Sequence, residues 1–434
     1  MLIRRLAVAV FALALAIAPL ASDAGPLHPA RTIVRTGDGP PLAVVELWFR
    51  APSMGFGSDP RIGIAQVAAE SVAASQGHDE PLAALVQDRG GHLQIATFAD
   101  SVQISAVVPE TAAAEVARAM LDDYTRPALT EDGFKRARAS VAIEATESQV
   151  DPDMQLRERL FGALFSQGPD RYAVLPTVKQ LGTLTYPEIV AFAKRAFRAE
   201  NAVAVVAGVH DSAPMLSALG GANARDPAES PLASTVVAAP ETVRGESVAG
   251  PALGFAFAGP PIADRRAATA MDFLSDYLLA PNTGALLQAL KNVAPGAKVN
   301  GQFITLHDPG ILLIEVVGDV SDAARNSVER ALQAVQRPLD PKAFEAAQRG
   351  YIYHVLHDLQ STQAQADNLG WYAIEGSPAY APFSGGVNDE YLKLARGLTP
   401  EYVAQVARKY LSAAPAVALL TVRQSTMRQQ ESAK

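Results

Sequence analysis

Two neighbouring histidines are the first residues in this sequence whose type and spacing suggest chemistry. His354 and His357 lie three residues apart, and Asp358 follows directly. On a helix both rings would share one face and could bind a single metal ion. No third ligand or catalytic glutamate follows at metallopeptidase spacing. We therefore treat the pair as weak metal candidates and expect histidines that pack on a long helix.

Other catalytic templates are missing from the 434 residues. The absence of cysteine excludes a thiol nucleophile, a thiolate metal site and disulfides. There is no G-x-S-x-G motif, and the glycine pairs at 90–91 and 385–386 lack the lysine of a phosphate-binding loop. The balance of 37 basic to 45 acidic residues argues against a nucleic-acid binder.

Residues 1–24 have the pattern of a cleavable secretory signal. Arg4 and Arg5 precede an apolar run, and Ser22 and Ala24 supply small residues for the signal peptidase. The run is short for a membrane helix, and no second stretch of spanning length follows. We expect a periplasmic or secreted chain that leaves the membrane after cleavage. An uncleaved anchor is the alternative.

The rest of the chain reads as a tandem duplication. Segments rich in helix and strand signals recur in the same order at offsets of 210 to 214 residues. Generic helix and strand composition is the alternative explanation of such matches. The matched pairs are 129–141 with 339–351, 184–206 with 398–420 and, more loosely, 91–109 with 296–318.

The repeat predicts an N-terminal domain over 27–215, a linker over 216–239 rich in alanine, serine, proline and glycine, and a C-terminal domain over 240–425. Each half should begin with a strand, at Leu42–Phe49 and Ala252–Phe257. A long helix, a strand pair, further helices and a closing strand should follow. This order predicts an α+β fold with two mostly antiparallel sheets packed with helices. Halves of this length could bury independent cores.

The segment SMGFGSDPRIGIAQVAAESVAAS after the first strand resembles the insulinase and pitrilysin family of zinc peptidases, the inverted zincins. In that family a glycine loop leads into a helix with H-x-x-E-H, whose histidines bind zinc together with a distant glutamate. The resemblance places the motif on residues 66–70. Gln66 and Glu70 then stand at the histidine positions and Ala69 at the position of the general base. Glu144 and Glu147 are candidates for the distal glutamate.

The resemblance extends over nearly the whole predicted mature chain. It includes GGHLQIATFADSVQISAVVP at 90–109, Asn201 before an apolar strand, and NTGALLQALKNV at 282–293. In the family this last segment supplies an arginine and a tyrosine that bind substrate. Lys291 stands at the arginine position and would keep the charge without the bidentate fork. The tyrosine position falls near Ala297 or Lys298.

The resemblance implies a fold like that of insulinase and the mitochondrial processing peptidase, with no catalytic residue, metal or cofactor in this chain. It predicts a pseudo-peptidase subunit that encloses a peptide substrate together with a zinc-bearing partner carrying H-x-x-E-H. Two alternatives stay open. One is a peptide-binding or scaffold homodimer without hydrolysis, and the other is a metallopeptidase with an unrecognised metal site.

Overall fold

The computed structural model describes residues 28–75, 80–148, 150–172, 176–247, 250–318, 321–382 and 389–422. The predicted signal, the glycine pair at 385–386 and the last residues of the predicted C-terminal domain lie outside these ranges. Within them, no helix combines the length and the apolarity that a membrane crossing needs.

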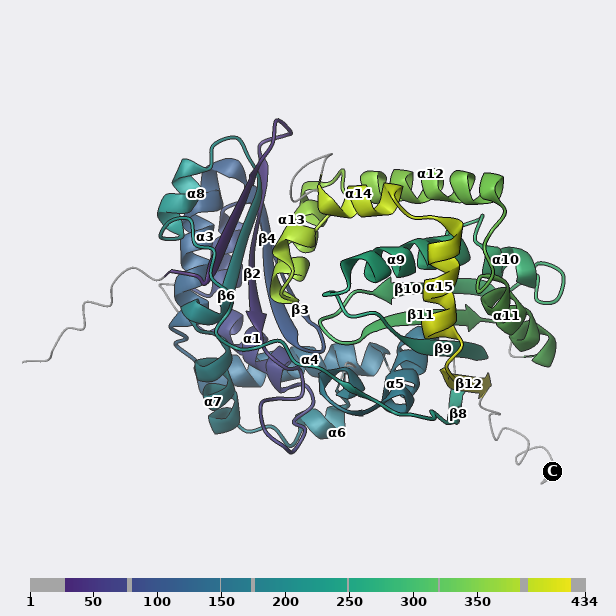
Figure 1. Cartoon of the computed structure of the whole chain (residues 1–434). Coiled ribbons are helices and arrows are strands. Elements are labelled where there is room, and N and C mark those ends of the chain that lie inside the picture. Colours follow the sequence, from purple (N-terminus) through teal and green to yellow (C-terminus); the bar gives the residue numbers. More distant parts are fainter. Residues whose placement is uncertain are drawn as a thin grey trace, which may run out of the picture.

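Two five-stranded sheets form the framework, and they share one strand order (Figure 1). The N-terminal sheet runs β1–β6–β2–β4–β3, and the C-terminal sheet runs β8–β12–β9–β11–β10. In each sheet only the first pair is parallel, which confirms the predicted α+β class with mostly antiparallel sheets. The strands are β1 (Arg31–Thr36), β2 (Leu42–Arg50), β3 (His92–Thr97), β4 (Ser101–Pro109), β6 (Ala202–Val209), β8 (Thr242–Ser247), β9 (Ala252–Gly259), β10 (Lys298–Ile304), β11 (Gly310–Val317) and β12 (Ala416–Val422).

The prediction that the halves begin with the strands at Leu42 and Ala252 is wrong. Each of these strands is preceded by another, β1 or β8, which pairs in parallel with the closing strand of its half. Both early strands lie at sheet edges and read RTIVRT and TVRGES. Charged residues are typical of edge strands, because they discourage pairing with other chains, but they weaken the hydrophobic pattern.

Helices cover the sheets in the order that the duplication predicts. In the N-terminal half α1 and α3 pack on one sheet face, and in the C-terminal half α9 and α15 do the same. The helices are α1 (Ile64–Ala74), α2 (Leu82–Asp88), α3 (Glu110–Thr125), α4 (Glu131–Ser148), α5 (Pro152–Leu164), α6 (Val178–Leu181), α7 (Tyr186–Ala196), α8 (Ala213–Ala218), α9 (Arg265–Leu279), α10 (Ala285–Leu290), α11 (Asp322–Ala334), α12 (Pro341–Asp358), α13 (Thr362–Ile374), α14 (Glu390–Arg396) and α15 (Pro400–Leu411).

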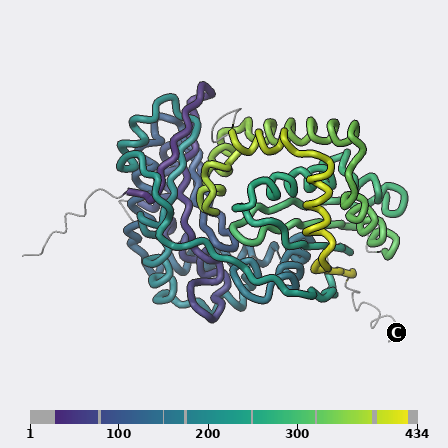
Figure 2. The backbone as a smooth tube through the Cα atoms, viewed as in Figure 1, coloured from purple at the N-terminus to yellow at the C-terminus, as the bar shows by residue number. Residues whose placement is uncertain are grey.

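The second face of each sheet is covered by a helix from the other half. Helix α13 packs on β2 and β6 of the N-terminal sheet, and α5 packs on β9 and β12 of the C-terminal sheet. The two helices begin 210 residues apart, so they are equivalent members of the repeat. The tube in Figure 2 shows the chain crossing between the halves at both places.

This exchange joins the cores of the two halves. Val44 and Trp48, on the α13 side of β2, belong to the same buried cluster as Phe255 and Phe273 of the C-terminal half. Their neighbours Val45 and the other residues with the opposite orientation pack on α1 and α3 instead. The expectation of two independent cores is therefore wrong, because neither half covers both faces of its own sheet.

The predicted linker runs as an ordered strap over both halves. The amide of Arg225 donates to the carbonyl of Ala30 at 3.0 Å, and the amide of Ser234 donates to the carbonyl of Asp308 at 3.0 Å. Near its end, the short strand β7 (Thr235–Val236) pairs with β5 (Phe165–Gln167). The strap is thus held by backbone bonds at several points.

Close packing of α13 on β2 depends on a glycine. A Cβ atom at Gly370 would lie 2.0 Å from Nε1 of Trp48, whose side chain is 1% exposed. That indole stacks on Phe98 at 5.6 Å and also contacts Trp371 edge-on at 6.2 Å between centroids. The ring therefore has little room to move, and only glycine allows this helix to approach.

We expect Gly370→Ala to destabilise the chain by about 1–3 kcal/mol, because the new methyl group overpacks a rigid tryptophan. The matched control is Gly350→Ala on α12, where an added Cβ would meet no atom within 4 Å. Helix propensity alone should stabilise both variants by about 0.5–1 kcal/mol. Urea denaturation of the two variants measures this difference. A stabilised Gly370→Ala variant would contradict the packing argument.

Candidate functional site

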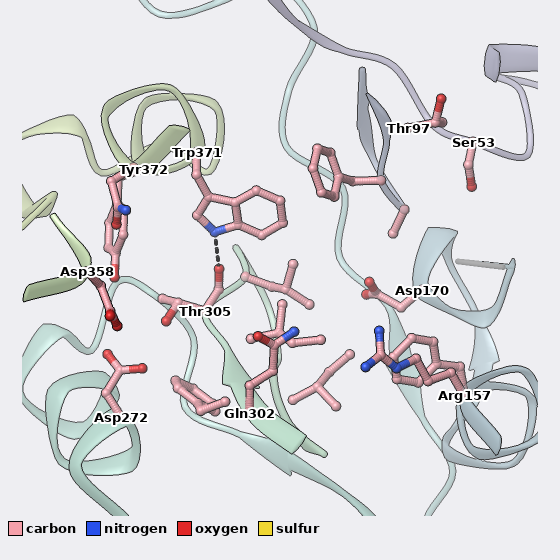
Figure 3. A pocket seen from close by; sticks show the side chains of 18 of the residues that line it. Ser53, Thr97, Arg157, Asp170, Asp272, Gln302, Thr305, Asp358, Trp371 and Tyr372 are labelled. Carbon is pink, nitrogen blue, oxygen red and sulfur yellow. Dashed lines mark hydrogen bonds between the residues drawn. The ribbon is translucent and has the colours of Figure 1, made fainter. Parts of the chain in front are cut away.

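A cavity of about 770 Å³ lies between the two halves. Figure 3 shows residues of both halves directed into it. One wall comes from α1, β3, α5 and the 3₁₀ turn η1 (Pro169–Tyr172), and the other comes from α9, β10, α12, α13 and α14. The exchanged helices thus line the cavity as well as closing the sheets. Its apolar lining includes Phe98, Met154, Phe161, Phe303, Ile304, Leu306, Ile311, Val355, Leu359 and Trp371.

The segment that resembles the zinc motif forms α1, and Gln66 reaches the cavity from it. The helix begins directly after Gly63, whose φ of 88° lies in the left-handed region. A Cβ atom there would lie 2.7 Å from Cγ of Pro176, so glycine is needed at this sharp entry. The glycine loop therefore sets the start of the helix and the direction of its side chains.

Helices α1 and α4 pack together and bring three of the predicted site residues to one place. Nε2 of Gln66 donates to Oε2 of Glu144 at 2.7 Å. Glu70 lies one turn further along α1 and interacts electrostatically with Glu144. Ala69 is fully buried, and its carbonyl accepts a hydrogen bond from the Tyr124 hydroxyl at 3.0 Å. The exposed Glu147 lies almost one turn beyond Glu144 on α4.

Glu70 has a perturbed acidity at this place. Burial, and then the nearby Glu144 carboxylate, raise the pKa of Glu70 to about 7. The cause is the cost of placing a second negative charge in a partly desolvated site next to the first. The position thus holds one amide and two carboxyl groups that repel each other when both are ionised.

These residues do not fit a catalytic zinc site. Zinc in peptidases takes about three protein ligands and a water, and H-x-x-E-H proteins supply two imidazoles and a base. Here the Gln66 amide donates its proton to the one remaining family-like ligand, and alanine replaces the base. In the described ranges no group of three histidine, aspartate or glutamate side chains is arranged to hold a metal.

The other predicted residues lie elsewhere. Nδ1 of His354 is 2.7 Å from Oδ1 of Asp276, and this histidine is 40% exposed. His357 is 59% exposed next to Tyr353, so it is a surface residue and not a packing one. Lys291 caps the C-terminal end of α10, is exposed, and does not line the cavity. The structure therefore does not bring these three side chains to the α1–α4 position.

A buried carboxyl group with several donors lies where α13 crosses the N-terminal sheet. Glu46 of β2 is fully buried and accepts hydrogen bonds from Nε1 of Trp48 at 2.7 Å and from Nε2 of Gln103 at 3.1 Å. Nε2 of Gln363 on α13 donates to it at 3.0 Å and also to Asp367. Burial first, and then the charge of Asp367, raise the pKa of Glu46 to about 9.

The opposite crossing uses a full ion pair. Nε and Nη2 of Arg157 on α5 donate to the two carboxylate oxygens of Glu315 on β11 at 3.0 and 3.2 Å. The Glu315 side chain has no exposed surface. Arg157 and Asp367 lie 210 residues apart, as do Ser105 and Glu315, so the two polar contacts occupy equivalent places of the repeat.

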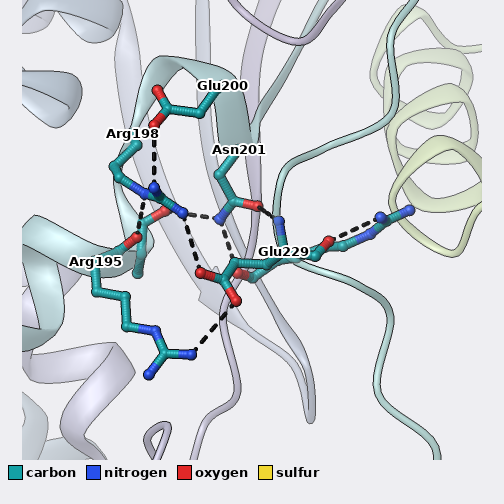
Figure 4. Close-up of polar contacts among 7 residues, drawn as sticks. Arg195, Arg198, Glu200, Asn201 and Glu229 are labelled. Carbon is teal, nitrogen blue, oxygen red and sulfur yellow. Dashed lines mark hydrogen bonds and ion pairs between the residues drawn. The ribbon is translucent and has the colours of Figure 1, made fainter.

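The strap closes the base of the N-terminal sheet through a second polar cluster (Figure 4). Nδ2 of Asn201 donates to the carbonyls of Arg50 and Ala196 at 2.9 and 2.8 Å, and its Oδ1 accepts from the amide of Glu229 at 3.2 Å. The Glu229 carboxylate pairs with Arg198 at 3.1 Å. Asn201 thus ties the closing strand to the strap.

Comparisons with known proteins were made on this geometry. Residues 183–351 match the sequence profile of the family described as peptidase M16 inactive domain. The chain belongs to the insulinase-like M16 family. Its zinc motif is replaced at both histidines and at the base, so it is a pseudo-peptidase member of that family.

Solved structures show the same fold as this M16 chain over its whole described length. A protease from Helicobacter pylori has a TM-score of 0.79 at 15% identity, covering 92% of this chain and 98% of the other. An M16-like peptidase structure from Alicyclobacillus acidocaldarius has a TM-score of 0.75 at 17% identity, covering 92% and 97%. An M16 inactive domain from Pseudomonas fluorescens has a TM-score of 0.75 at 16% identity, with the same coverage. No curated protein is significantly similar in sequence.

Sequence reasoning missed the polar residues of the crossings and of the cavity. A lone glutamate inside the apolar run LAVVELWFR was the available signal for Glu46. Asp170 and Asp272 also line the cavity, and burial raises the pKa of each to about 7. Both occur in helical segments whose patterns look unremarkable in sequence.

The α1–α4 geometry of this M16 chain predicts that two substitutions restore metal binding. We expect the double variant Gln66→His, Glu70→His to bind about one zinc ion per chain, because Glu144 would supply the third ligand. Plasma emission after dialysis against zinc measures the metal content. Adding Glu144→Ala should lower it, and an equal zinc content in all variants would contradict the prediction. Peptidase activity should stay absent, because Ala69 cannot act as a base.

The acidity of Glu46 predicts a pH-dependent stability. The folded chain keeps a proton on this group that the unfolded chain releases above its ordinary pKa near 4.5, so stability is lost as pH rises toward 9. Glu46→Gln should remove this loss. Between pH 5 and pH 8 we expect the variant to gain about 2–4 kcal/mol relative to the parent in urea denaturation. Glu158→Gln, exposed on α5, is the control, and parallel pH profiles of Glu46→Gln and the parent would refute the assignment.

Proposed function

We propose that this M16 chain is the non-catalytic subunit of an exported, heterodimeric zinc metallopeptidase and forms part of its substrate chamber. The partner would be a related chain with H-x-x-E-H, which would bind zinc and cut the peptide. The observation that carries the proposal is the Gln66–Glu144 hydrogen bond beside Ala69, because it keeps the helices of a zinc site together without its ligands or base.

The contribution of the chain would be to hold and select peptides. The cavity beside Gln66 has the volume and the largely apolar lining that small-ligand and peptide sites need. Positioning a substrate against a catalytic group on another chain accelerates the reaction without any chemistry of its own. Its formal net charge of −8 favours neutral or basic peptides over acidic ones.

Co-expression with a related chain that carries H-x-x-E-H tests the proposal. We expect a complex of the two chains in size-exclusion chromatography, and hydrolysis of a quenched peptide that exceeds the activity of either chain alone. A chelator should abolish this activity. A partner whose motif glutamate is changed to glutamine is the control, and its complex should form but remain inactive.

Two results would replace the proposal with its alternatives. Chelator-sensitive hydrolysis by this chain alone would mean a metallopeptidase with an unrecognised metal site. A stable homodimer that ignores the zinc-bearing chain, binds peptides and hydrolyses none would mean a scaffold.

A further inference from the structure

The end of the cavity formed by the C-terminal half is acidic. Asp272 of α9 and Asp358 at the end of α12 face each other there (Figure 3). The Tyr391 hydroxyl donates to Oδ2 of Asp272 at 2.9 Å, which fixes the direction of this carboxyl group. The Asp358 side chain is 78% exposed and therefore lies at the mouth. A ligand entering the cavity would meet one fixed and one movable carboxylate.

The cavity supplies no positive charge to balance them. Its described lining contains three aspartates, Asp170, Asp272 and Asp358, and one basic residue, Arg157. The Arg157 guanidinium is already bound by both oxygens of Glu315, so its charge is compensated outside the cavity. Burial raises the pKa of Asp272 to about 7, which reflects the cost of an ionised carboxylate without a cation.

The walls between the two ends suit an apolar chain. Phe303 and Ile304 of β10 and Trp371 of α13 line this middle part, and Gln302 projects among them (Figure 3). The Trp371 indole donates to the carbonyl of Thr305 at 2.7 Å, so the ring is held in place. An aliphatic stem could lie along these rings while its charged end reaches the carboxylates.

We propose that the cavity binds a peptide segment that directs a lysine or arginine side chain to Asp272 and Asp358 and packs a large apolar neighbour against Phe303 and Trp371. The inference rests on the proposed peptide-holding function and adds the class of peptide. It assigns Asp272 and Asp358 as residues that determine specificity.

Fluorescence anisotropy with the full predicted mature chain tests the assignment. The probes are a labelled hexapeptide with one lysine between leucine and phenylalanine, and its counterpart with norleucine in place of lysine. We expect the lysine peptide to bind about tenfold more tightly. Asp272→Asn and Asp358→Asn should each reduce this ratio, and the norleucine peptide should bind all proteins equally.

Asp358→Asn keeps the test valid if Asp272→Asn unfolds, since this exposed side chain contributes little to the core. Glu345→Gln on α12 is the matched control, because its carboxylate is 70% exposed and does not line the cavity. Equal binding of both peptides would overturn the charge selection and leave peptide holding intact. Binding of neither peptide would overturn the proposed holding function as well. Equal competition by a free aliphatic diamine would show that the amine alone is recognised.

Discussion

The architecture depends on one constraint: each sheet has two apolar faces, and each half provides its own helices for only one of them. The central strands β2, β6, β9 and β11 are buried along almost their whole length. Water would cost such strands much of their burial free energy on the open face. The reciprocal crossing of α5 and α13 removes that cost, and it also brings the walls of the cavity together.

Polar groups mark where the crossings happened, and the duplicated halves solved the same problem with different charges. One crossing uses Glu46 with amide donors and Asp367, and the other uses Arg157 with Glu315. A buried group of this kind is costly when its partner is removed, so it discourages other registers of helix on sheet. The same logic applies at α1, where a hydrogen bond now joins helices that a metal would join in a catalytic relative.

Much of this arrangement could be predicted from the sequence, because local periodicity and repetition are strong signals. The helices α4, α7, α12 and α15 and the closing strands follow from the matched segments. The edge strands β1 and β8 were missed because their alternation is polar. The exchange of α5 and α13 could not be predicted, since an apolar helix face does not say which sheet it covers.

The site divides in the same way. The position of the degenerate motif on α1 follows from a glycine loop and a spacing, which are local features. Its contact with Glu144 depends on the packing of two helices, and the sequence left Glu144 and Glu147 as alternatives. Asp272 was not found at all, because its role depends on α12, α13 and α14 converging on one place, which no local pattern records.

The crossing of α13 also imposes an order in time. The last strand of the N-terminal sheet ends at Val209, but the helix that covers its second face ends only at Ile374, 165 residues later. A chain emerging from a ribosome or a translocation channel therefore carries a finished but half-bare sheet through most of its synthesis. Chaperones that shield apolar surface have their natural target on that face, and the chain can reach its native state only when nearly all of it has been delivered.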